Sequence, residues 1–449
     1  MYIKNKEELT SHGEVTGRGT VIDIIEHALL AADPYTATIN LVHLHGNILN
    51  VDNLRYDLSK RGKIYLFGAG KATFPIAKAL EEILGERISD GVVILKEGQE
   101  GTLERVRMRE ASHPLPDERG FMAAKEMKSL AETAQKGDLV FCAITGGSSA
   151  LAPFPAPGIT IEEKRRVHEL LIYSGATIRE INAVRKHLSQ IKGGKLALSI
   201  FPAELINLTV SDVTGDPLDC ITDLTVPDTS TFEDAIRVLK KYDLVGKIPK
   251  SALEYLLNAT PEMENPRNFD GMPVHTFVIV KSKVVCEAAS NRAKELGFAP
   301  MILTTTFEGE SREVSHIFTG MAREIKTYGR PLTTPCVVIA GGETTVTISG
   351  NCGKGGPNQE FVLSAALQLA GVSGVVIAAI DTDGTDGPTE LAGGIIDSST
   401  TERAKEKGLD LLESLLSHDA STILSKLSDA IITGQTGTNV NSLYVMLAR

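Results

Sequence analysis

KIYLFGAGKATFPIAKAL, residues Lys63–Leu80, is the stretch around which the rest of the chain can be arranged. Its apolar run Ile64–Phe67 is too short for a helix and is bounded by glycine, so it predicts a buried strand. Gly68 and Gly70 then turn the chain, and Phe74–Leu80 continues with apolar residues at helical spacing. The stretch therefore predicts a strand, a glycine turn and a helix, the unit from which α/β sheets are built.

Such a turn places the amides of a helix N-terminus at the carboxyl end of a strand, where they favour anions. Lys71 lies on the first helical turn, so its ammonium can reach the same anion. This predicts a phosphate or carboxylate site, and the alternative is an ordinary α/β turn with a solvated lysine. Neither familiar nucleotide motif is complete. A P-loop would need glycine at position 65, which is Tyr65, and serine or threonine at position 72, which is Ala72. The dinucleotide fingerprint would need a third glycine at position 73, which is Thr73.

The composition is ordinary for a globular protein, and the length indicates two domains. At 449 residues the chain exceeds the usual single core. The net charge of −11 argues against a nucleic-acid partner held by phosphate contacts. The five cysteines show no C-x-x-C spacing, which fits a reducing compartment, and no apolar run indicates a signal peptide or a membrane span. We therefore expect a cytoplasmic protein without a membrane or nucleic-acid partner.

Strand and helix patterns alternate along the whole chain. We predict an α/β fold of two domains, each a mostly parallel sheet covered by helices on both faces. The polar, Asn-containing run Leu244–Phe269 is expected to cross between them, which gives domains of residues 1–243 and 244–449. Strands of the second domain are expected at residues 274–280, 300–304, 335–340 and 375–380.

Ligands of open parallel sheets bind where the loops leave the carboxyl ends of the strands. Five loops that follow expected strands combine glycine, hydroxyl and acidic or basic residues with almost no bulky side chain. They are Gly68–Lys71, Thr145–Ser149, Ser211–Asp216, Gly341–Thr344 and Asp381–Gly387. Their common composition predicts a polyanion held by backbone amides, with carboxylates for a metal or a proton.

The acidic loops allow two interpretations each. Asp381, Asp383 and Asp386 have the alternating spacing of oxygen ligands for Mg²⁺ or Ca²⁺, although the calcium-loop pattern is incomplete. The alternative is a tight loop in which the aspartates cap their own backbone. Asp212 and Asp216 are each either a general base for a hydroxyl group or a cap for the following segment.

A cationic segment and a second glycine loop complete the candidate site. Within Ile178–Leu196, a helix expected from about Ile178 to Gln190 places Asn182, Arg185 and Ser189 on one face. Arg185 is predicted to hold a small carboxylate with its two-pronged guanidinium, and the alternative is a solvated charged face. Gly353–Glu360 is a glycine loop that opens a helix at Asn358, another end that favours anions.

Taken in order, these motifs resemble the glycerate 2-kinase family of the type with a C-terminal MOFRL domain. The resemblance covers almost the whole chain. Its most specific parts are Gly70–Ala72, Ser112–Asp117, Asn182–Ser189 with Lys192–Gly194, Ser211–Asp216, Gly341–Thr344 and Thr382–Pro388. It implies a Rossmann-like N-terminal domain, a MOFRL-type C-terminal domain, and transfer of phosphate from ATP to the 2-hydroxyl of D-glycerate with Mg²⁺. Both substrates would lie in a cleft between the domains.

The kinase interpretation gives each candidate residue a role. Lys71, Asp212 and Asp216 are the expected catalytic residues, and Ser148, Ser149 and Arg185 the expected substrate-binding residues. The expected nucleotide-binding residues are Gly68, Gly70, Gly341, Gly342, Glu343 and Asn358, and the expected Mg²⁺ ligands are Asp383 and Asp386. A homodimer is compatible with the sequence.

Three positions depart from the family pattern. Ser148 replaces the third glycine of the S-G-G-G-S turn, the segment Thr222–Leu224 is shorter than usual, and Pro357 stands where G-G-R-N-Q-E often has arginine. The rival interpretations are a hydroxypyruvate reductase-type NAD(P)-dependent oxidoreductase, a kinase of a related hydroxy acid, and a binding protein without catalysis. The incomplete dinucleotide fingerprint at Thr73 argues against the oxidoreductase.

Overall fold

The computed structural model describes residues 1–348, 350 and 352–449, which form two compact units. The central unit comprises Pro34–Ile279, and the terminal unit combines Met1–Asp33 with Val280–Arg449. Both ends of the chain therefore belong to one unit. The expected boundary between residues 243 and 244 does not coincide with this division, because the chain passes between the units at residues 33–34 and 279–280.

The central unit is built on a six-stranded sheet in the order β6-β5-β4-β7-β8-β9. Its strands are β4 (Ile64–Ala69), β5 (Ile88–Lys96), β6 (Arg107–Ala111), β7 (Leu139–Ile144), β8 (Glu204–Val210) and β9 (Val274–Val280). The pairs from β6 to β8 are all parallel. β4, β7 and most of β8 are buried along their length, which confirms the buried strands predicted from their apolar runs. A separate antiparallel sheet contains β1 (Val42–His45), β2 (Ile48–Val51) and β3 (Leu54–Asp57).

Helices cover the six-stranded sheet of the central unit, and four of them form an apolar cluster of their own. The helices are α3 (Pro34–Leu41), α4 (Thr73–Leu84), α5 (Glu118–Ala131), α6 (Ser148–Leu151), α7 (Ile161–Ile172), α8 (Ile178–His187), α9 (Lys195–Ile200), α10 (Leu218–Ile221), α11 (Phe232–Lys241) and α12 (Lys250–Leu257), with 3₁₀ turns at Leu58–Lys60, Gly85–Arg87 and Pro261–Met263. Tyr65 and Phe67 of β4 share an apolar core with residues of α5 and α9. Every residue of β4 is buried, and α4 buries Ile76, Ala77 and Leu80, so both elements of the strand–turn–helix unit are anchored by apolar burial.

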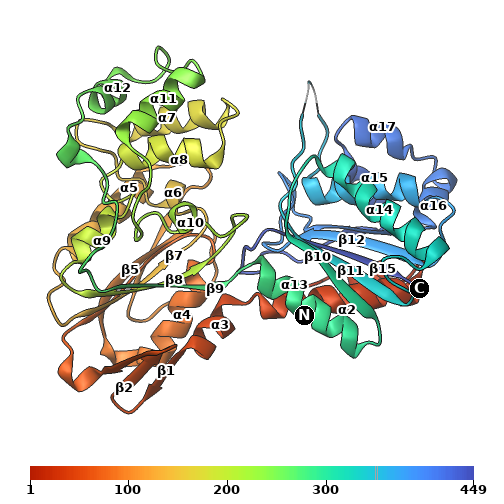
Figure 1. Ribbon diagram of the computed structural model, residues 1–449, viewed down its shortest axis with the longest axis horizontal. Helices are drawn as coiled ribbons and strands as arrows, with labels where there is room; N and C mark the ends of the chain where they lie inside the picture. The colour runs from red at the N-terminus through yellow and green to blue at the C-terminus, as the bar shows by residue number, and fades with distance from the viewer. Residues whose placement is uncertain (349, 351) are drawn as a thin grey trace. The chain divides into compact units, whose positions relative to one another are not determined.

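The helices α7, α8, α11 and α12 form a separate apolar cluster, which Figure 1 shows at the top of the central unit. Capping boxes at Thr160, Thr177 and Thr231 begin α7, α8 and α11. Leu244, with Ile248 and Leu256, is buried in the same cluster. The expected domain crossing at residues 244–269 is therefore wrong: its apolar residues are core residues of the central unit.

The terminal unit contains a mixed six-stranded sheet in the order β10-β11-β15-β12-β13-β14. Its strands are β10 (Ala299–Phe307), β11 (Cys336–Gly342), β12 (Val375–Asp381), β13 (Gly393–Asp397), β14 (Ala430–Ile431) and β15 (Ser442–Ala448). Among these described strands β10 and β11 pair in parallel, and the other neighbours are antiparallel. The α/β class is confirmed, but the mostly parallel sheet expected here is wrong because β15 returns between β11 and β12. The segment 274–280, expected in this domain, is β9 of the central sheet.

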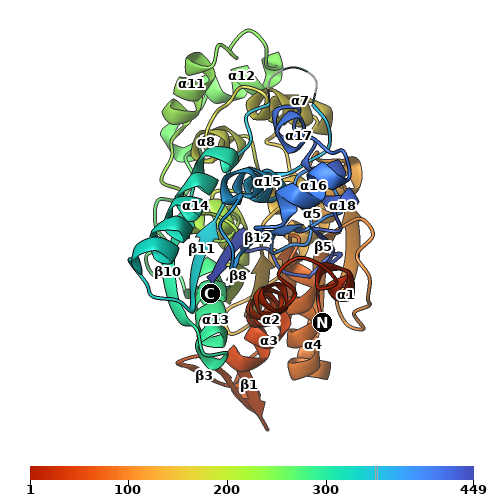
Figure 2. The ribbon, with the colours of Figure 1, turned by 90° about the vertical axis from the view of Figure 1, so that its right-hand side faces the viewer.

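Helices cover both faces of the terminal sheet. They are α1 (Lys6–Leu9), α2 (Val15–Ala31), α13 (Ser282–Glu295), α14 (Ser311–Tyr328), α15 (Pro357–Leu369), α16 (Thr400–Glu406), α17 (Leu411–Leu416) and α18 (Ala420–Lys426). Figure 1 shows α2 and α13 on one face and α14 and α15 on the other. Figure 2 shows the red N-terminal helices beside the blue C-terminal segments. Of the helices that the structure describes, none is long and apolar enough to cross a membrane.

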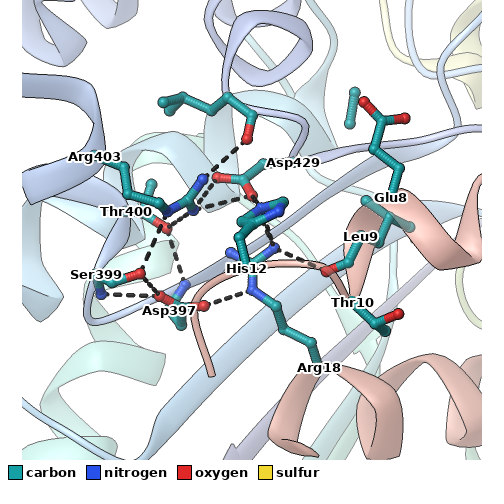
Figure 3. A network of polar contacts seen from close by, with 12 residues as sticks. Glu8, Leu9, Thr10, His12, Arg18, Asp397, Ser399, Thr400, Arg403 and Asp429 are labelled. Atoms are coloured by element: carbon teal, nitrogen blue, oxygen red, sulfur yellow. Dashed lines mark hydrogen bonds and ion pairs between the residues drawn. The ribbon is translucent and has the colours of Figure 1, made fainter. Parts of the chain in front are cut away.

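A buried ion-pair network joins the N-terminal segment to the rest of the terminal unit (Figure 3). The fully buried Arg18 of α2 donates from Nε to Asp397 Oδ2 at 2.5 Å and from Nη1 to Asp429 Oδ1 at 2.8 Å. Arg403 and His12 also contact the Asp429 carboxylate, at 2.7 and 2.9 Å. Although burial raises the pKa of Asp397, Arg18 and Ser399 lower it to about 2. Charge in this network is compensated, which explains how residues 1–33 are held in the terminal unit.

Candidate functional site

The glycine turn after β4 is tied to the turn after β7. Lys71 N donates to Gly146 O at 2.8 Å, Ala72 N donates to Thr145 Oγ1 at 3.1 Å, and Gly70 N and Thr73 N donate to other backbone oxygens. The expectation of bare amides at this helix start is therefore wrong for these four positions. Gly70 has φ of +142°, and a Cβ there would lie 2.1 Å from Thr145 Oγ1. The absence of a side chain at Gly70 permits this close packing.

Lys71, His113 and Asp212 meet at the paired glycines 146 and 147. A Cβ on Gly147 would lie 3.4 Å from Lys71 Cγ and 3.2 Å from His113 Cδ2. A Cβ on Gly146 would lie 1.8 Å from Asp212 Oδ2. The three side chains thus approach the backbone of one turn only because it has no side chains of its own. The structure brings the side chains of a lysine after β4, a histidine after β6 and an aspartate after β8 to the turn that follows β7.

Asp216 is placed differently from Asp212. It has a left-handed φ of +53°, and its amide donates to Val213 O at 3.0 Å within a tight turn. Asp residues tolerate this conformation better than most, so the position has a structural reason for its aspartate. Of the two carboxylates predicted as a base, Asp212 is the one that lies against the Gly146–Gly147 turn.

The expected substrate-binding residues Ser149 and Arg185 line one small pocket, whereas Ser148 is buried in the turn beside it. Pro116, Lys164, Val167, His168, Leu188 and Lys192 complete the pocket lining. Arg185 donates to His168 Nδ1 at 2.7 Å, and Lys192 donates to Ser149 Oγ at 2.7 Å. The expected helix to about residue 190 ends at His187, because Ser189 turns back to bond Phe154 O. We call these eight lining residues the cationic pocket.

The electrostatics of the cationic pocket are dominated by burial among like charges. Burial, with neighbouring Lys192 and Arg185, lowers the pKa of Lys164 well below its ordinary value. Burial lowers the pKa of Arg185 to about 10. Burial and then Arg185 lower the pKa of His168 to about 2, so the imidazole is neutral and accepts from the guanidinium. Such shifts at a concave site are typical of functional groups.

The acidic loop of the terminal unit caps backbone amides. Asp386 is buried, and its two carboxylate oxygens accept from the amides of Asn358 and Gln359 at the start of α15, at 3.0 and 2.9 Å. Asp383 Oδ1 accepts from Thr385 N at 2.8 Å, and Asp381 Oδ1 accepts from Asp383 N at 3.1 Å. These contacts are the capping alternative of the sequence analysis, and Asp386 in particular is occupied by helix capping.

Asp381 and Asp383 nevertheless offer oxygen atoms that suit Mg²⁺. Burial, followed by the charges of Asp383, Asp386 and Glu343, raises the pKa of Asp381 well above its ordinary value. A bound cation would relieve this crowding of carboxylates, so the donor set fits a divalent metal. Within the described ranges, no group of three His, Cys, Asp or Glu residues is arranged to hold a metal ion. One or two carboxylates with water and phosphate oxygens are, however, a usual shell for Mg²⁺.

The other expected nucleotide-binding residues have packing roles. Gly68 lies within β4, where a Cβ would meet Thr73 at 2.5 Å. Gly342 has φ of +149° and a Cβ there would lie 2.2 Å from Phe307 N, and Gly341 packs against Ser282. Asn358 donates to Asp386 and Ser442, and its own Oδ1 is buried without a partner among the described atoms. Of this set, Glu343 is exposed at the end of β11.

Sequence reasoning missed several members of these clusters. Lys164 and His168 lie four residues apart on α7, which aligns them on one helical face. That spacing was readable, but a lysine and a histidine on a charged helix normally indicate a solvated surface. Lys192 belonged to a motif of the resemblance but was given no role, and Asp381 was part of the acidic pattern although the kinase interpretation assigned the metal to Asp383 and Asp386. Only burial distinguishes Lys164 and Lys192 from ordinary surface lysines.

Two family models match the chain. The first, described as a domain of unknown function (DUF4147), matches residues 20–257, and the second, described as the MOFRL family, matches residues 336–442. Together they cover both the Lys71–Asp212 region and the acidic loop.

Known proteins are similar over nearly their whole length. A glycerate 2-kinase of Pyrococcus horikoshii is 42% identical over 426 residues, which cover 94% of this chain and 96% of the relative. A D-glycerate 2-kinase of Thermotoga maritima is 41% identical over 387 residues, 86% of this chain and 90% of the relative. The crystal structure of a glycerate kinase from Thermotoga maritima has a TM-score of 0.83 and 38% identity, and covers 96% of this chain and 99% of its own.

Proposed function

The chain belongs to the glycerate 2-kinase family, and from that premise we propose that it transfers the γ-phosphoryl group of ATP to the 2-hydroxyl of D-glycerate. The observation that carries the proposal is the similarity to named glycerate 2-kinases at 41 and 42% identity along most of the chain. A cytoplasmic setting belongs to the same proposal.

Phosphoryl transfer requires positioning and charge stabilisation more than covalent chemistry by the protein. In the proposal, Lys71 stabilises negative charge on the transferring group, because its side chain lies against the Gly146–Gly147 turn beside Asp212. Asp212, against the same turn, accepts the proton of the 2-hydroxyl as general base. Asp216 supports the Asp212 loop through its left-handed turn. Arg185 and Ser149 bind the acid, and Ser148 holds their turn.

The acidic loop of the terminal unit serves the nucleotide in this proposal. Asp381 and Asp383 would hold Mg²⁺, which when bound neutralises charge on the ATP phosphates. Asp386 and Asn358 fix the start of α15, and Glu343 adds a carboxylate near Asp381. Gly68, Gly70, Gly341 and Gly342 contribute by allowing the close backbone packing that sets these loops.

The test is an assay of the purified protein with ATP, Mg²⁺ and D-glycerate, in which the 2- and 3-phosphate products are separated. We expect 2-phosphoglycerate and ADP in equal amounts. A parallel arm with NAD(P)H and hydroxypyruvate tests the oxidoreductase alternative, and L-glycerate and other hydroxy acids test the acceptor. Oxidation of NAD(P)H without phosphate transfer, or transfer to none of the acids, would refute the kinase assignment.

A further inference from the structure

The cationic pocket contains positively charged side chains that are almost completely removed from solvent. Lys164 is 7% exposed and Lys192 is 1% exposed, and both line the pocket with Arg185. Burying an ammonium group is costly unless a counter-charge and hydrogen bonds replace its hydration. Several buried basic groups in one pocket therefore require partners that offset the lost hydration of their charged forms.

The protein's own contacts compensate them only in part. Lys192 has Asp223, whose two carboxylate oxygens lie 3.3 Å from Nζ. Lys164 donates to the carbonyl of Leu188 at 2.8 Å. Among the described residues, Arg185 pairs with the neutral His168 and with no carboxylate. One carboxylate, Asp223, thus faces three basic side chains, and an anion received by the pocket would stabilise their charged forms.

We propose that Lys164 and Lys192 act with Arg185 as the receptacle for the carboxylate group of a small hydroxy-acid substrate. This inference rests on the proposed kinase function, and it assigns two residues, Lys164 and Lys192, that the motifs did not. A planar carboxylate matches the fork of Arg185, and the lysines supply point charges from its other sides.

The size and position of the pocket favour a small acid. The cavity is small: about 10 Å³ is open to the centre of a water-sized sphere, which is room for one small polar group such as a carboxylate. Pro116, Val167 and Leu188 provide an apolar wall around the charges. Ser149, bonded to Lys192, lies two residues after Gly147, which packs against Lys71. An acid held by its carboxylate in the pocket would therefore present its hydroxyl groups toward the turn that carries Lys71.

Binding of an anion in the cationic pocket should change the protonation of Lys164. Lys164 faces Lys192, Arg185, Lys195 and Asp223, and burial among these groups lowers its pKa well below the usual lysine range. A carboxylate beside Lys164 favours its charged form, so that binding takes up protons over the pH range between the free and the bound pKa. Affinity for the acid should fall as the pH rises through that range.

The experiment is calorimetric titration of the full-length protein with D-glycerate, without ATP, in two buffers of different ionisation enthalpy. We expect proton uptake by the wild type. In Lys164→Met, affinity should be about tenfold weaker, as for loss of one charge-assisted contact, and proton uptake should be lost. Arg185→Lys should weaken D-glycerate binding similarly, because it loses the fork. Arg165→Met, an exposed cation on the same helix, is the matched control and should bind normally.

Three further measurements keep the test decisive. Thermal melting should show that Lys164→Met without ligand is as stable as the wild type or more stable, because a buried basic group without a carboxylate bonded to it has been removed; a structural lysine would give the opposite result. ATP and inorganic phosphate are titrated in parallel. If Lys164→Met weakens ATP and not D-glycerate, the pocket binds phosphate and the carboxylate assignment is overturned. If it changes neither, the receptacle itself is overturned, while wild-type glycerate phosphorylation would still support the proposed function.

Discussion

The central and terminal units bury charges of opposite sign beside the loops that follow their strands. In the central unit, Lys164, Lys192 and Arg185 lie together, and burial depresses their pKa values. In the terminal unit, burial and neighbouring carboxylates raise the pKa of Asp381, and burial raises the pKa of Asp386 to about 6. In each cluster, ionisation of the buried groups is therefore unfavourable unless a counter-charge is added. In the proposed function, a hydroxy acid would supply the counter-charge for the first cluster and a metal–nucleotide the counter-charge for the second.

The Arg18 network shows what a compensated cluster looks like. It is as deeply buried as the other two, yet Arg18 pairs with Asp397 and Asp429, and the pKa of Asp397 is lowered to about 2. Compensation marks a structural network, whereas surplus charge of one sign marks a candidate binding site. The following substitutions test this distinction.

The largest expected effect is on stability, in the compensated network. Arg18→Met leaves Asp397 and Asp429 buried with reduced pairing, and we expect a loss of about 3 to 5 kcal/mol in the free energy of unfolding. Denaturant titration measures it. Arg237→Met, which removes an exposed pair with Glu233 and Asp234, should cost less than about 1 kcal/mol. Equal losses in the two variants would show that burial of the network contributes nothing.

Lys71→Ala should affect catalysis and not stability. The backbone contact of Lys71 to Gly146 persists in the variant, so the fold is expected to survive. Loss of a cation at the transferring phosphoryl group should raise the barrier by about 3 kcal/mol, roughly a hundredfold in turnover. Steady-state kinetics with a melting curve on the same sample separate the two effects. Turnover near that of the wild type would remove Lys71 from the catalytic residues.

The acidic residues of the two units should respond differently to Mg²⁺. Asp383→Asn should raise the Mg²⁺ concentration needed for half-maximal activity, by about tenfold, and excess Mg²⁺ should restore turnover. Asp212→Asn should lower turnover at every Mg²⁺ concentration, because metal does not replace a base. Mg²⁺ titrations of both variants decide the roles, and rescue of Asp212→Asn instead would exchange them.

Asp386→Asn sharpens the same comparison. Its carboxylate caps α15, so we expect a loss of about 1 kcal/mol or more in stability. A large shift in Mg²⁺ requirement without a loss of stability would instead make Asp386 a direct ligand, as the sequence analysis proposed.

The smallest effect concerns the pH dependence of stability. Burial lowers the pKa of Lys195 to about 8, whereas an unfolded lysine titrates near 10.4. Between these values the unfolded chain binds more protons, so the free energy of unfolding should rise with pH. Denaturation across this range should show the rise, and Lys195→Met should reduce it. Lys240→Met, at an exposed position, is the control and should leave the slope unchanged.

Much of the fold was predictable because it depends on local patterns. The apolar runs of β4, β7, β8 and β12 specify short-range structure. What the sequence did not reveal was which strands become neighbours. β15 is an apolar run like the others, and only its pairing between β11 and β12 makes the terminal sheet mixed.

By itself the sequence determined the α/β class, the loops that carry Lys71, Asp212 and Asp383, and the family. Tertiary structure alone decided which unit residues 1–33 and 244–279 join, since that depends on buried pairs such as Arg18–Asp397. It also decided which charges are buried. Lys164 and Arg165 are adjacent and chemically alike, but one lines the cationic pocket and the other faces solvent. The physical reason is that desolvation and the surrounding charges act through space, from residues far away in sequence.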